Sequence, residues 1–230
     1  MSDELLRVSK LGVVLDEKVV LHDLSFSLGA QETLVILGPN GAGKTVLLRA
    51  LLGLLPHQGD VVWKKGITRG YVPQRIPLNP ELPVTVADFF ALKGTSARST
   101  AESLSHVGLD EKAFSKKPLG LISSGQFQRV LIAWALVDHP DVLIVDEPTA
   151  GIDIGGEEII HDLFERTRRE RGLAIILVTH DLSVVYGDAT NVLCLNANAP
   201  CYGPPRDVLT PETLKSMYGR DIKLYEHSHG

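Results

Sequence analysis

The 230-residue sequence predicts an α/β fold with a mostly parallel sheet, and three observations support this prediction. A glycine-rich loop at residues 38–45 lies between a buried-strand pattern and a helix pattern. Further along, short runs of Val, Leu and Ile alternate with helical patterns, as in sheets whose faces are covered by helices. Residues 75–137, by contrast, contain almost no strand pattern, which indicates an inserted helical subdomain.

The first elements read as an antiparallel β subdomain followed by the start of the core. Leu5–Leu15 and Val19–Leu28 are β-rich runs around a short polar turn, which predicts a hairpin. Glu32–Leu37 is apolar throughout and predicts a buried strand. A helix is expected over Lys44–Leu55, ended by Pro56.

The middle of the chain changes from strands to helices. Val61–Trp63 and Ile67–Val72 predict two short strands. Residues 75–83 are proline-rich and irregular, and helices are then expected at Val84–Leu92, Ala101–Val107 and Glu111–Phe114.

The last part returns to alternating helices and strands. An apolar helix is expected at Phe127–Val137, and a buried strand follows at Asp141–Val145. Glu157–Arg171 has the pattern of an amphipathic helix, and Leu173–Val178 that of another buried strand. We therefore expect one domain over residues 1–230. Its α/β core and antiparallel β subdomain take residues 1–74 and 138–230, and the helical subdomain takes residues 75–137.

Bulk properties narrow the class of protein. The chain is 44% hydrophobic and 22% charged, which is ordinary for a globular protein, and its net charge of −5 argues against a nucleic-acid partner. Its N-terminus is acidic, which predicts no signal peptide, and the longest apolar stretches are too short to span a membrane. Cys194 and Cys201 do not suggest a disulfide framework. We expect a soluble, cytoplasmic chain.

The glycine-rich loop carries the first chemical signal. Its pattern is G-x-x-x-x-G-K-[ST], and its residues are Gly38, Pro39, Asn40, Gly41, Ala42, Gly43, Lys44 and Thr45. Between a strand and a helix, such a loop wraps phosphate with backbone N–H groups. Lys44 is expected to reach the β- and γ-phosphates, and the Thr45 hydroxyl to bind Mg²⁺. The core is therefore predicted to be that of a P-loop NTPase.

Four further residues lie where parallel strands end. Asp146 ends a buried strand and is suited to Mg²⁺, and Glu147 beside it is suited to activating water. His180 follows the next buried strand and could hydrogen-bond a γ-phosphate, although a lone histidine is more often structural. Gln74 ends a strand before the insertion, where its amide could reach Mg²⁺ or lie exposed in a loop. The Asp-Glu pair, taken alone, could merely cap its strand.

Ser123 begins the apolar helix at Ser123-Ser-Gly-Gln126 and is a good N-cap. Alone, this motif would be an ordinary helix cap. The order of the motifs along the chain favours a functional role for it. They follow one another as phosphate loop, glutamine, serine-glycine motif, Asp-Glu strand and histidine.

With these motifs, the whole chain resembles the ATPase subunit of an ATP-binding cassette (ABC) transporter. The resemblance makes Gly38–Thr45 the Walker A loop, and Ile122–Gln126 the counterpart of the LSGGQ signature. The resemblance also gives a role to individual residues. Gln74 is the Q-loop glutamine, Asp146 the Walker B acid and Glu147 the catalytic carboxylate. Asp153 is the D-loop acid, and His180 is the switch histidine. Members form head-to-tail dimers that bind two ATP molecules with Mg²⁺.

In such dimers the signature of one subunit completes the site of the other. The resemblance therefore implies that Ser123 and Gly125 contact the γ-phosphate held by a second copy, and it makes Gln126 a further nucleotide-binding residue. Mg²⁺ would be held by Thr45, assisted by Gln74 and Asp146.

A finer resemblance is to zinc- and manganese-type metal importers. It rests on Gly70–Gln74, Leu82–Val86, Val192–Asn196 and a tail with His227 and His229. It implies ATP-driven import of a divalent metal through separate permease subunits, at the cytoplasmic face of the membrane, with an extracytoplasmic metal-binding protein as indirect partner. The two tail histidines could bind metal, but such a tail is more often a solvated end.

Three positions depart from the family pattern. Leu15 stands where an aromatic residue usually stacks on adenine, which predicts nucleotide binding weaker by about 2- to 12-fold. Val46 replaces a second hydroxyl, which removes one phosphate hydrogen bond worth about 1 kcal/mol. In the signature, Ile122 replaces leucine and Ser124 replaces the first glycine.

Three alternatives stay open at this point. An ABC ATPase for a different substrate would have the same motifs, because the transport pathway lies in another polypeptide. A soluble ABC protein of translation or DNA repair usually carries two cassettes or a long coiled-coil insertion, and this chain has neither. A small-molecule kinase would not need the Ser123–Gln126 motif.

Overall fold

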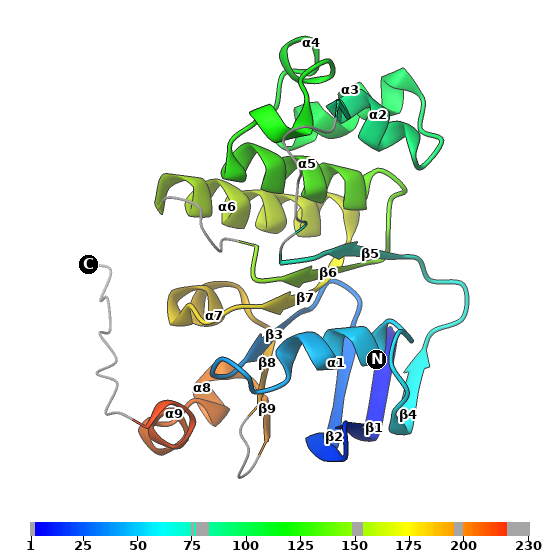
Figure 1. The fold of residues 1–230 in the computed structure, drawn as a ribbon. Helices are drawn as coiled ribbons and strands as arrows, with labels where there is room; N and C mark the ends of the chain where they lie inside the picture. The colour runs from blue at the N-terminus through cyan, green and yellow to red at the C-terminus, as the bar shows by residue number, and fades with distance from the viewer. Residues whose placement is uncertain (1–2, 75, 77–82, 149–153, 196–199, 220–230) are drawn as a thin grey trace, which may run out of the picture. The chain divides into compact units, whose positions relative to one another are not determined.

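The computed structural model describes residues 3–74, 76, 83–148, 154–195 and 200–219, with residues 154–156 described by their backbone only. The chain divides into two compact units, whose elements are labelled in Figure 1. Unit 1 comprises Met1–Leu5, Leu28–Glu32 and Trp63–Val178. Unit 2 comprises Leu6–Ser27, Thr33–Val62 and Thr179–Gly230.

Unit 1 contains three parallel strands. They are β5 (Arg69–Val72), β6 (Val142–Asp146) and β7 (Ala174–Val178), with β6 in the middle. The register places Val72 opposite Val145 and Asp146 opposite Val178. Every residue of β6 and β7 is buried, which explains their continuous apolar sequence.

The other described elements of unit 1 are helical. They are α2 (Val86–Ala91), α3 (Ala97–His106), α4 (Glu111–Phe114), the 3₁₀ turn η1 (Leu119–Leu121), α5 (Ser124–Leu136) and α6 (Ile154–Arg171). α5 approaches β5 at Gly70, where a Cβ atom would lie 2.7 Å from the carbonyl oxygen of Ala135. A glycine is therefore required for this helix to pack so closely on the strand.

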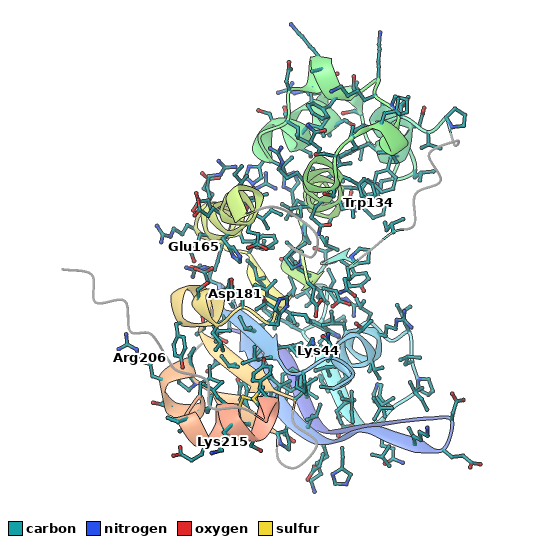
Figure 2. The ribbon with its side chains drawn as sticks, turned by 60° about the vertical axis from the view of Figure 1, so that its left-hand side comes forward. Lys44, Trp134, Glu165, Asp181, Arg206 and Lys215 are labelled. Atoms are coloured by element: carbon teal, nitrogen blue, oxygen red, sulfur yellow. A yellow bond between two sulfur atoms is a disulfide. The ribbon has the colours of Figure 1, made fainter. Side chains whose placement is uncertain are left out.

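An aromatic contact joins α2 to α5. The rings of Phe89 and Trp134 stack with their centroids 5.1 Å apart, and the Trp134 indole donates to the Phe89 carbonyl over 3.1 Å. The ammonium of Lys93 lies 4.2 Å from the centroid of the Trp134 ring and 2.6 Å from a carboxylate oxygen of Asp138. Trp134 is labelled on α5 in Figure 2.

A half-buried histidine joins α3 to α6. His106 Nε2 lies 2.8 Å from the Thr167 hydroxyl oxygen, and that hydroxyl donates to the Leu163 carbonyl over 2.7 Å. Because the hydroxyl proton is already used, Thr167 accepts from His106, which fixes the proton on Nε2. The guanidinium of Arg166 donates to the His106 carbonyl. Burial, with the charges of Arg171 and Arg166, lowers the pKa of His106.

Unit 2 holds most of a three-stranded sheet, in the order β2-β1-β4. Its strands are β1 (Glu4–Leu15), β2 (Lys18–Gly29) and β4 (Gln58–Trp63). The turn between β1 and β2 is Asp16-Glu17, with φ of 47° and 63°. Two positive φ values in a two-residue connection define a type I′ turn, which matches the twist of a hairpin.

Unit 2 also contains β3 (Thr33–Leu37), β8 (Asn191–Cys194) and β9 (Cys201–Gly203), in that order. β3 and β8 are parallel, and β8 and β9 are antiparallel. The described helices of this unit are α1 (Lys44–Leu51), α7 (Leu182–Asp188), α8 (Pro205–Val208) and α9 (Pro211–Tyr218).

The predicted fold class is confirmed, with corrections to single elements. The helix after the glycine-rich loop ends at Leu51 and not at Leu55, because Gly53 adopts a left-handed φ of 73°. α6 begins at Ile154, three residues before the predicted start. The division into a core and a subdomain at residues 75–137 stays a prediction.

The two cysteines form a disulfide, which the sequence analysis did not expect. Cys194 and Cys201 stand directly opposite each other on β8 and β9. Strand register, which cysteine spacing alone does not reveal, brings the two sulfurs together.

Among the described residues, no helix combines the length and the apolar character needed to cross a membrane.

Candidate active site

The glycine-rich loop begins directly after β3. Gly41 and Gly43 have φ of 83° and 93°, a region that glycine adopts without strain. α1 then begins at Lys44, with Gly43 as its N-cap and no side-chain cap. The first N–H groups of a helix have no acceptor within the helix, so the loop offers donors and the positive end of a dipole to an anion.

The Lys44 side chain lies along this loop. Only 7% of the residue is exposed, and its ammonium donates to the carbonyls of Gly38 over 2.9 Å and Pro39 over 3.2 Å. Figure 2 labels Lys44 at the start of α1. The positive charge is thus held at the loop itself, where it can exchange carbonyl oxygens for phosphate oxygens.

Two neighbouring segments contact the loop within unit 2. A Cβ atom on Gly38 would lie 2.8 Å from the carbonyl oxygen of Leu195, just after β8. A Cβ atom on Gly43 would lie 2.8 Å from Leu21 Cδ2 and 3.1 Å from Val20 Cγ1, both on β2. The loop therefore depends on glycine at both positions for packing, and at Gly43 for backbone conformation as well.

The remaining predicted binding residues of this loop line its surface. Asn40 and Gly41 are exposed, whereas Pro39, Ala42, Thr45 and Val46 are half-buried. Leu15 is the last residue of β1, half-buried, at the hairpin that also carries Val20 and Leu21. The loop and its apolar neighbours on β1 and β2 thus belong to the same unit.

His180 belongs to unit 2 and is exposed. It stands between Thr179, whose N–H donates to the Ile36 carbonyl over 3.4 Å, and Asp181, the N-cap of α7. The Asp181 carboxylate accepts from the Ser183 N–H over 2.8 Å. His180 is therefore held between a residue tied to β3 and a capped helix start.

In unit 1, Asp146 is the last residue of β6, and Glu147 follows it directly. Asp146 is only 2% exposed, whereas Glu147 is half-buried and has a φ of 45°. The Glu147 N–H donates to the Val178 carbonyl over 3.1 Å. A left-handed φ costs a residue other than glycine about 1–2 kcal/mol.

Gln74 meets Glu147 directly. Its Nε2 donates to Glu147 Oε2 over 2.5 Å. The contact follows from the register, because Val72 of β5 stands opposite Val145 of β6, and each side chain lies two residues further along. Sequence reasoning placed both residues near a phosphate but missed this hydrogen bond. The shared edge of parallel strands was the signal that could have found it.

Ser123 is the N-cap of α5. Its hydroxyl accepts from the Gln126 N–H over 3.2 Å, and the Gln126 side chain accepts from the Ser123 N–H over 3.1 Å, which completes a capping box. Ser123 and Ser124 are exposed, and Gly125 is half-buried within the first turn. The predicted cap is confirmed, and it presents the helix start to solvent.

Two predicted features lie outside the described residues, namely Asp153 and the tail histidines His227 and His229. Within the described ranges, no group of three or more His, Cys, Asp or Glu side chains is arranged to hold a metal ion. The structure thus brings Gln74 to Glu147 in unit 1, and Lys44 to the glycine-rich loop in unit 2.

Comparison with known proteins decides the family. The sequence profile of the ABC transporter family matches residues 21–150, which is more than half of the chain. The chain belongs to the ABC transporter family. The match begins at Leu21, beside the glycine-rich loop, and extends past Glu147, so it includes both the loop and the Asp-Glu strand.

Relatives of this ABC chain support the same family over its whole length. A protein of Yersinia pestis named "Zinc import ATP-binding protein ZnuC" is 38% identical over 98% of this chain and 90% of its own length. A protein of Pasteurella multocida with the same name is 37% identical over 98% and 87% of the two lengths. One of Pseudomonas entomophila is 36% identical over 100% and 90%.

Solved structures of ABC proteins share the fold. An inward-facing ABC transporter assigned to the metal-chelate type matches with a TM-score of 0.85 and 25% identity, over 94% of this chain and 90% of that one. CbiO1 of Clostridium perfringens, part of the ABC transporter complex CbiONQ, matches with a TM-score of 0.76 and 28% identity, over 92% and 93%. As a member of this family, the chain is an ABC-type ATP hydrolase.

Proposed function

We propose that this chain is the ATPase subunit of an importer that takes up zinc through a separate membrane permease. The proposal is carried by near full-length similarity to proteins named as zinc import ATP-binding proteins. Those names favour zinc over manganese, which the sequence pattern alone left open. The ATP-binding role agrees with a glycine-rich loop that offers N–H donors and a lysine ammonium.

ATP is the substrate, and its phosphates would bind at Gly38–Thr45. Lys44 would leave the carbonyls of Gly38 and Pro39 and pair with the β- and γ-phosphates. Asn40 and Gly41 are exposed, so the loop is open to an incoming nucleotide. Leu15 would lie against the base, without the aromatic face that stacks on adenine.

Mg²⁺ is implied by the family, and the donor set fits it. The Thr45 hydroxyl, the Gln74 amide oxygen and the Asp146 carboxylate are oxygen ligands, the kind that Mg²⁺ prefers. When bound, the ion would supply charge neutralisation at the β- and γ-phosphates.

Glu147 is the proposed general base. Its carboxylate would polarise a water molecule for in-line attack on the γ-phosphate. Lys44 and His180 would stabilise the charge that develops on the leaving and equatorial oxygens. Gln74 would release Glu147 for this role, since its amide holds the carboxylate in the structure.

A second copy of the chain would complete each site. Ser123 is exposed at the start of α5, with Gly125 and Gln126 half-buried beside it, and this helix start suits the γ-phosphate bound by the other copy. Asp153 would contribute to the contact between the two copies. ATP hydrolysis is therefore proposed to depend on a homodimer.

The proposed partners place the chain at the cytoplasmic face of the membrane. It would bind permease subunits there, and an extracytoplasmic metal-binding protein would deliver the ion from the other side. No nucleic acid is expected, because the chain carries a net charge of −5.

The test is transport by the reconstituted complex. The chain is purified with its permease, placed in vesicles with ATP, and uptake of Zn²⁺ and Mn²⁺ is measured beside phosphate release. We expect ATP-dependent uptake of Zn²⁺ that is abolished by Glu147→Gln. ATP hydrolysis with no Zn²⁺ uptake would refute the proposed cargo.

A metal chelate is a second candidate cargo. It is favoured by the structural match to a transporter assigned to the metal-chelate type. The same vesicle assay distinguishes the two, since free Zn²⁺ and a chelated metal are offered separately.

A further inference from the structure

Two cysteines face each other beside the glycine-rich loop. Cys194 ends β8 and Cys201 begins β9, and the antiparallel register pairs them directly. They form a disulfide with a Cα–Cα distance of 4.9 Å. This separation lies inside the range of about 4.4–6.8 Å that disulfides span.

β8 connects this pair to the loop. Cys194 stands opposite Leu37, the last residue of β3 before Gly38. The next residue, Leu195, donates its N–H to the Leu37 carbonyl over 2.7 Å. The carbonyl oxygen of Leu195 lies where it would be 2.8 Å from a Cβ atom on Gly38. Leu195, which contacts Gly38 of the phosphate loop, is thus the residue next to Cys194.

The two sulfurs differ in access to solvent. Cys194 is fully buried, whereas Cys201 is partly exposed. β9 is also held independently of the disulfide, because the Tyr202 hydroxyl donates to the Ser27 carbonyl over 2.9 Å and its ring lies against Phe26. Opening the disulfide would therefore loosen the Cys194–Cys201 connection without detaching β9.

We propose that Cys194 and Cys201 form a reversible thiol–disulfide pair that controls nucleotide binding at the adjoining phosphate loop. This inference rests on the proposed binding of ATP to that loop. The oxidised pair fixes Leu195 against Gly38 and keeps the loop in the shape that accepts phosphate. The reduced pair lets Leu195 move away from Gly38 and weakens ATP binding.

The chemistry is thiol–disulfide exchange with a dithiol reductant or with glutathione. A thiolate of the reductant attacks the partly exposed sulfur of Cys201, the bond between the two cysteine sulfurs breaks, and Cys194 leaves as a thiolate that takes a proton. A second thiolate then attacks the mixed disulfide and releases Cys201, which takes another proton. Two electrons pass to the protein, and the reductant becomes a disulfide. Glutathione disulfide reverses the reaction.

The experiment uses the full chain equilibrated in glutathione buffers of graded ratio. Free thiols are alkylated and counted by intact mass, and ATP affinity is measured by calorimetry at the two ends of the series. We expect two alkylated cysteines in the reduced chain and none in the oxidised chain. ATP should bind the oxidised chain more tightly by about fivefold or more, the lower end of coupling between two sites.

Reciprocity gives a second readout. If oxidation tightens ATP binding, saturating ATP must make the disulfide harder to reduce by the same factor. The glutathione ratio at half-reduction is therefore expected to shift when ATP is present. Equal ATP affinities in the two redox states, or an unshifted half-reduction point, would overturn the inference while leaving the proposed ATPase intact.

Two variants complete the test. Cys201→Ser should bind ATP like the reduced wild type under all conditions. Cys201 is chosen because its replacement leaves the buried Cys194 in place. Tyr202→Phe removes the hydrogen bond to Ser27 but keeps both thiols, so it should still respond to the glutathione ratio. If neither redox state of the wild type binds ATP, the proposed function fails as well as the inference.

Discussion

Gln74 donates a hydrogen bond from Nε2 to Glu147 Oε2 over 2.5 Å. The two residues come from the ends of neighbouring parallel strands, β5 and β6. Glu147 itself has a left-handed φ of 45°. An amide that holds the proposed base must move away before the base can bind water, so the position of Gln74 would govern when hydrolysis begins.

Replacing Glu147 by glutamine is expected to stop turnover without stopping binding. The amide keeps the size of the side chain but cannot act as a base, and loss of a general base lowers rates by about 10²- to 10⁴-fold. Phosphate release measures the rate, and calorimetry measures ATP affinity. Size-exclusion chromatography with ATP should show a trapped dimer. Near-normal turnover by Glu147→Gln would remove Glu147 from this role.

The two positive-φ glycines of the loop should respond differently to alanine. Both positions carry the strain of a left-handed residue, about 1–2 kcal/mol. Gly41 has open space around its Cβ position, whereas at Gly43 a Cβ atom would lie 2.8 Å from Leu21 Cδ2. Gly43→Ala is therefore expected to lower the Tm and the ATP affinity more than Gly41→Ala does.

Thermal denaturation and ATP titration of the two alanine variants check this prediction together. Equal losses at Gly41 and Gly43 would mean that the contact with β2 has no energetic weight.

Two capping boxes in unit 1 provide a matched pair. Ser123 caps α5 and Thr85 caps α2, each with a reciprocal hydrogen bond to the residue three positions on. Replacing either by alanine should destabilise the chain by about 1 kcal/mol. Only Ser123→Ala is expected to reduce ATP hydrolysis strongly as well, because Ser123 is proposed to contact the γ-phosphate in a second copy.

Chemical denaturation and phosphate release separate the two effects. If Thr85→Ala lowers hydrolysis as much as Ser123→Ala does, Ser123 acts only as a helix cap.

The sequence predicted those features that depend on local pattern. The glycine-rich loop is set by the spacing of Gly38, Gly43 and Lys44, and β6 and β7 by uninterrupted apolar runs. Long-range pairing was less accessible. The Gln74–Glu147 hydrogen bond requires the register of two strands that are about seventy residues apart in the sequence, and Cys194–Cys201 requires the register of β8 and β9.

Helix ends were harder to predict than helix centres. Leu52 to Leu55 continue the apolar pattern of α1, which favoured a longer helix, but Gly53 takes a left-handed φ and stops it at Leu51. Gly53, which has no Cβ, outweighed the three leucines around it, because a left-handed backbone cannot continue the hydrogen bonding of an α-helix.

An aromatic residue at Leu15 is expected to improve nucleotide binding. Leu15 is half-buried at the end of β1, so a larger ring can extend toward solvent and stack on a base. Leu15→Tyr should raise ATP affinity by about 2- to 12-fold, the range that corresponds to one aromatic stacking contact. Calorimetric titration with ATP measures the gain. Leu15→Met, which adds length without a ring, is the matched control, and unchanged affinity for Leu15→Tyr would refute a base contact here.

The stability of the chain should depend on pH through His106. Burial, Arg171 and Arg166 lower its folded-state pKa, and Glu170 opposes them. Because the folded pKa lies below the unfolded value of about 6.5, the folded state favours neutral histidine. The stabilisation is therefore complete above pH 6.5 and is lost as the pH falls through the lowered pKa. Urea unfolding at pH 7.5, 6.5 and 5.5 should show this fall in the wild type and a flatter profile in His106→Gln, whose amide can still donate to Thr167.

His57→Gln, at an exposed histidine, should keep the wild-type slope. An unchanged slope in His106→Gln would assign the pH dependence to another group.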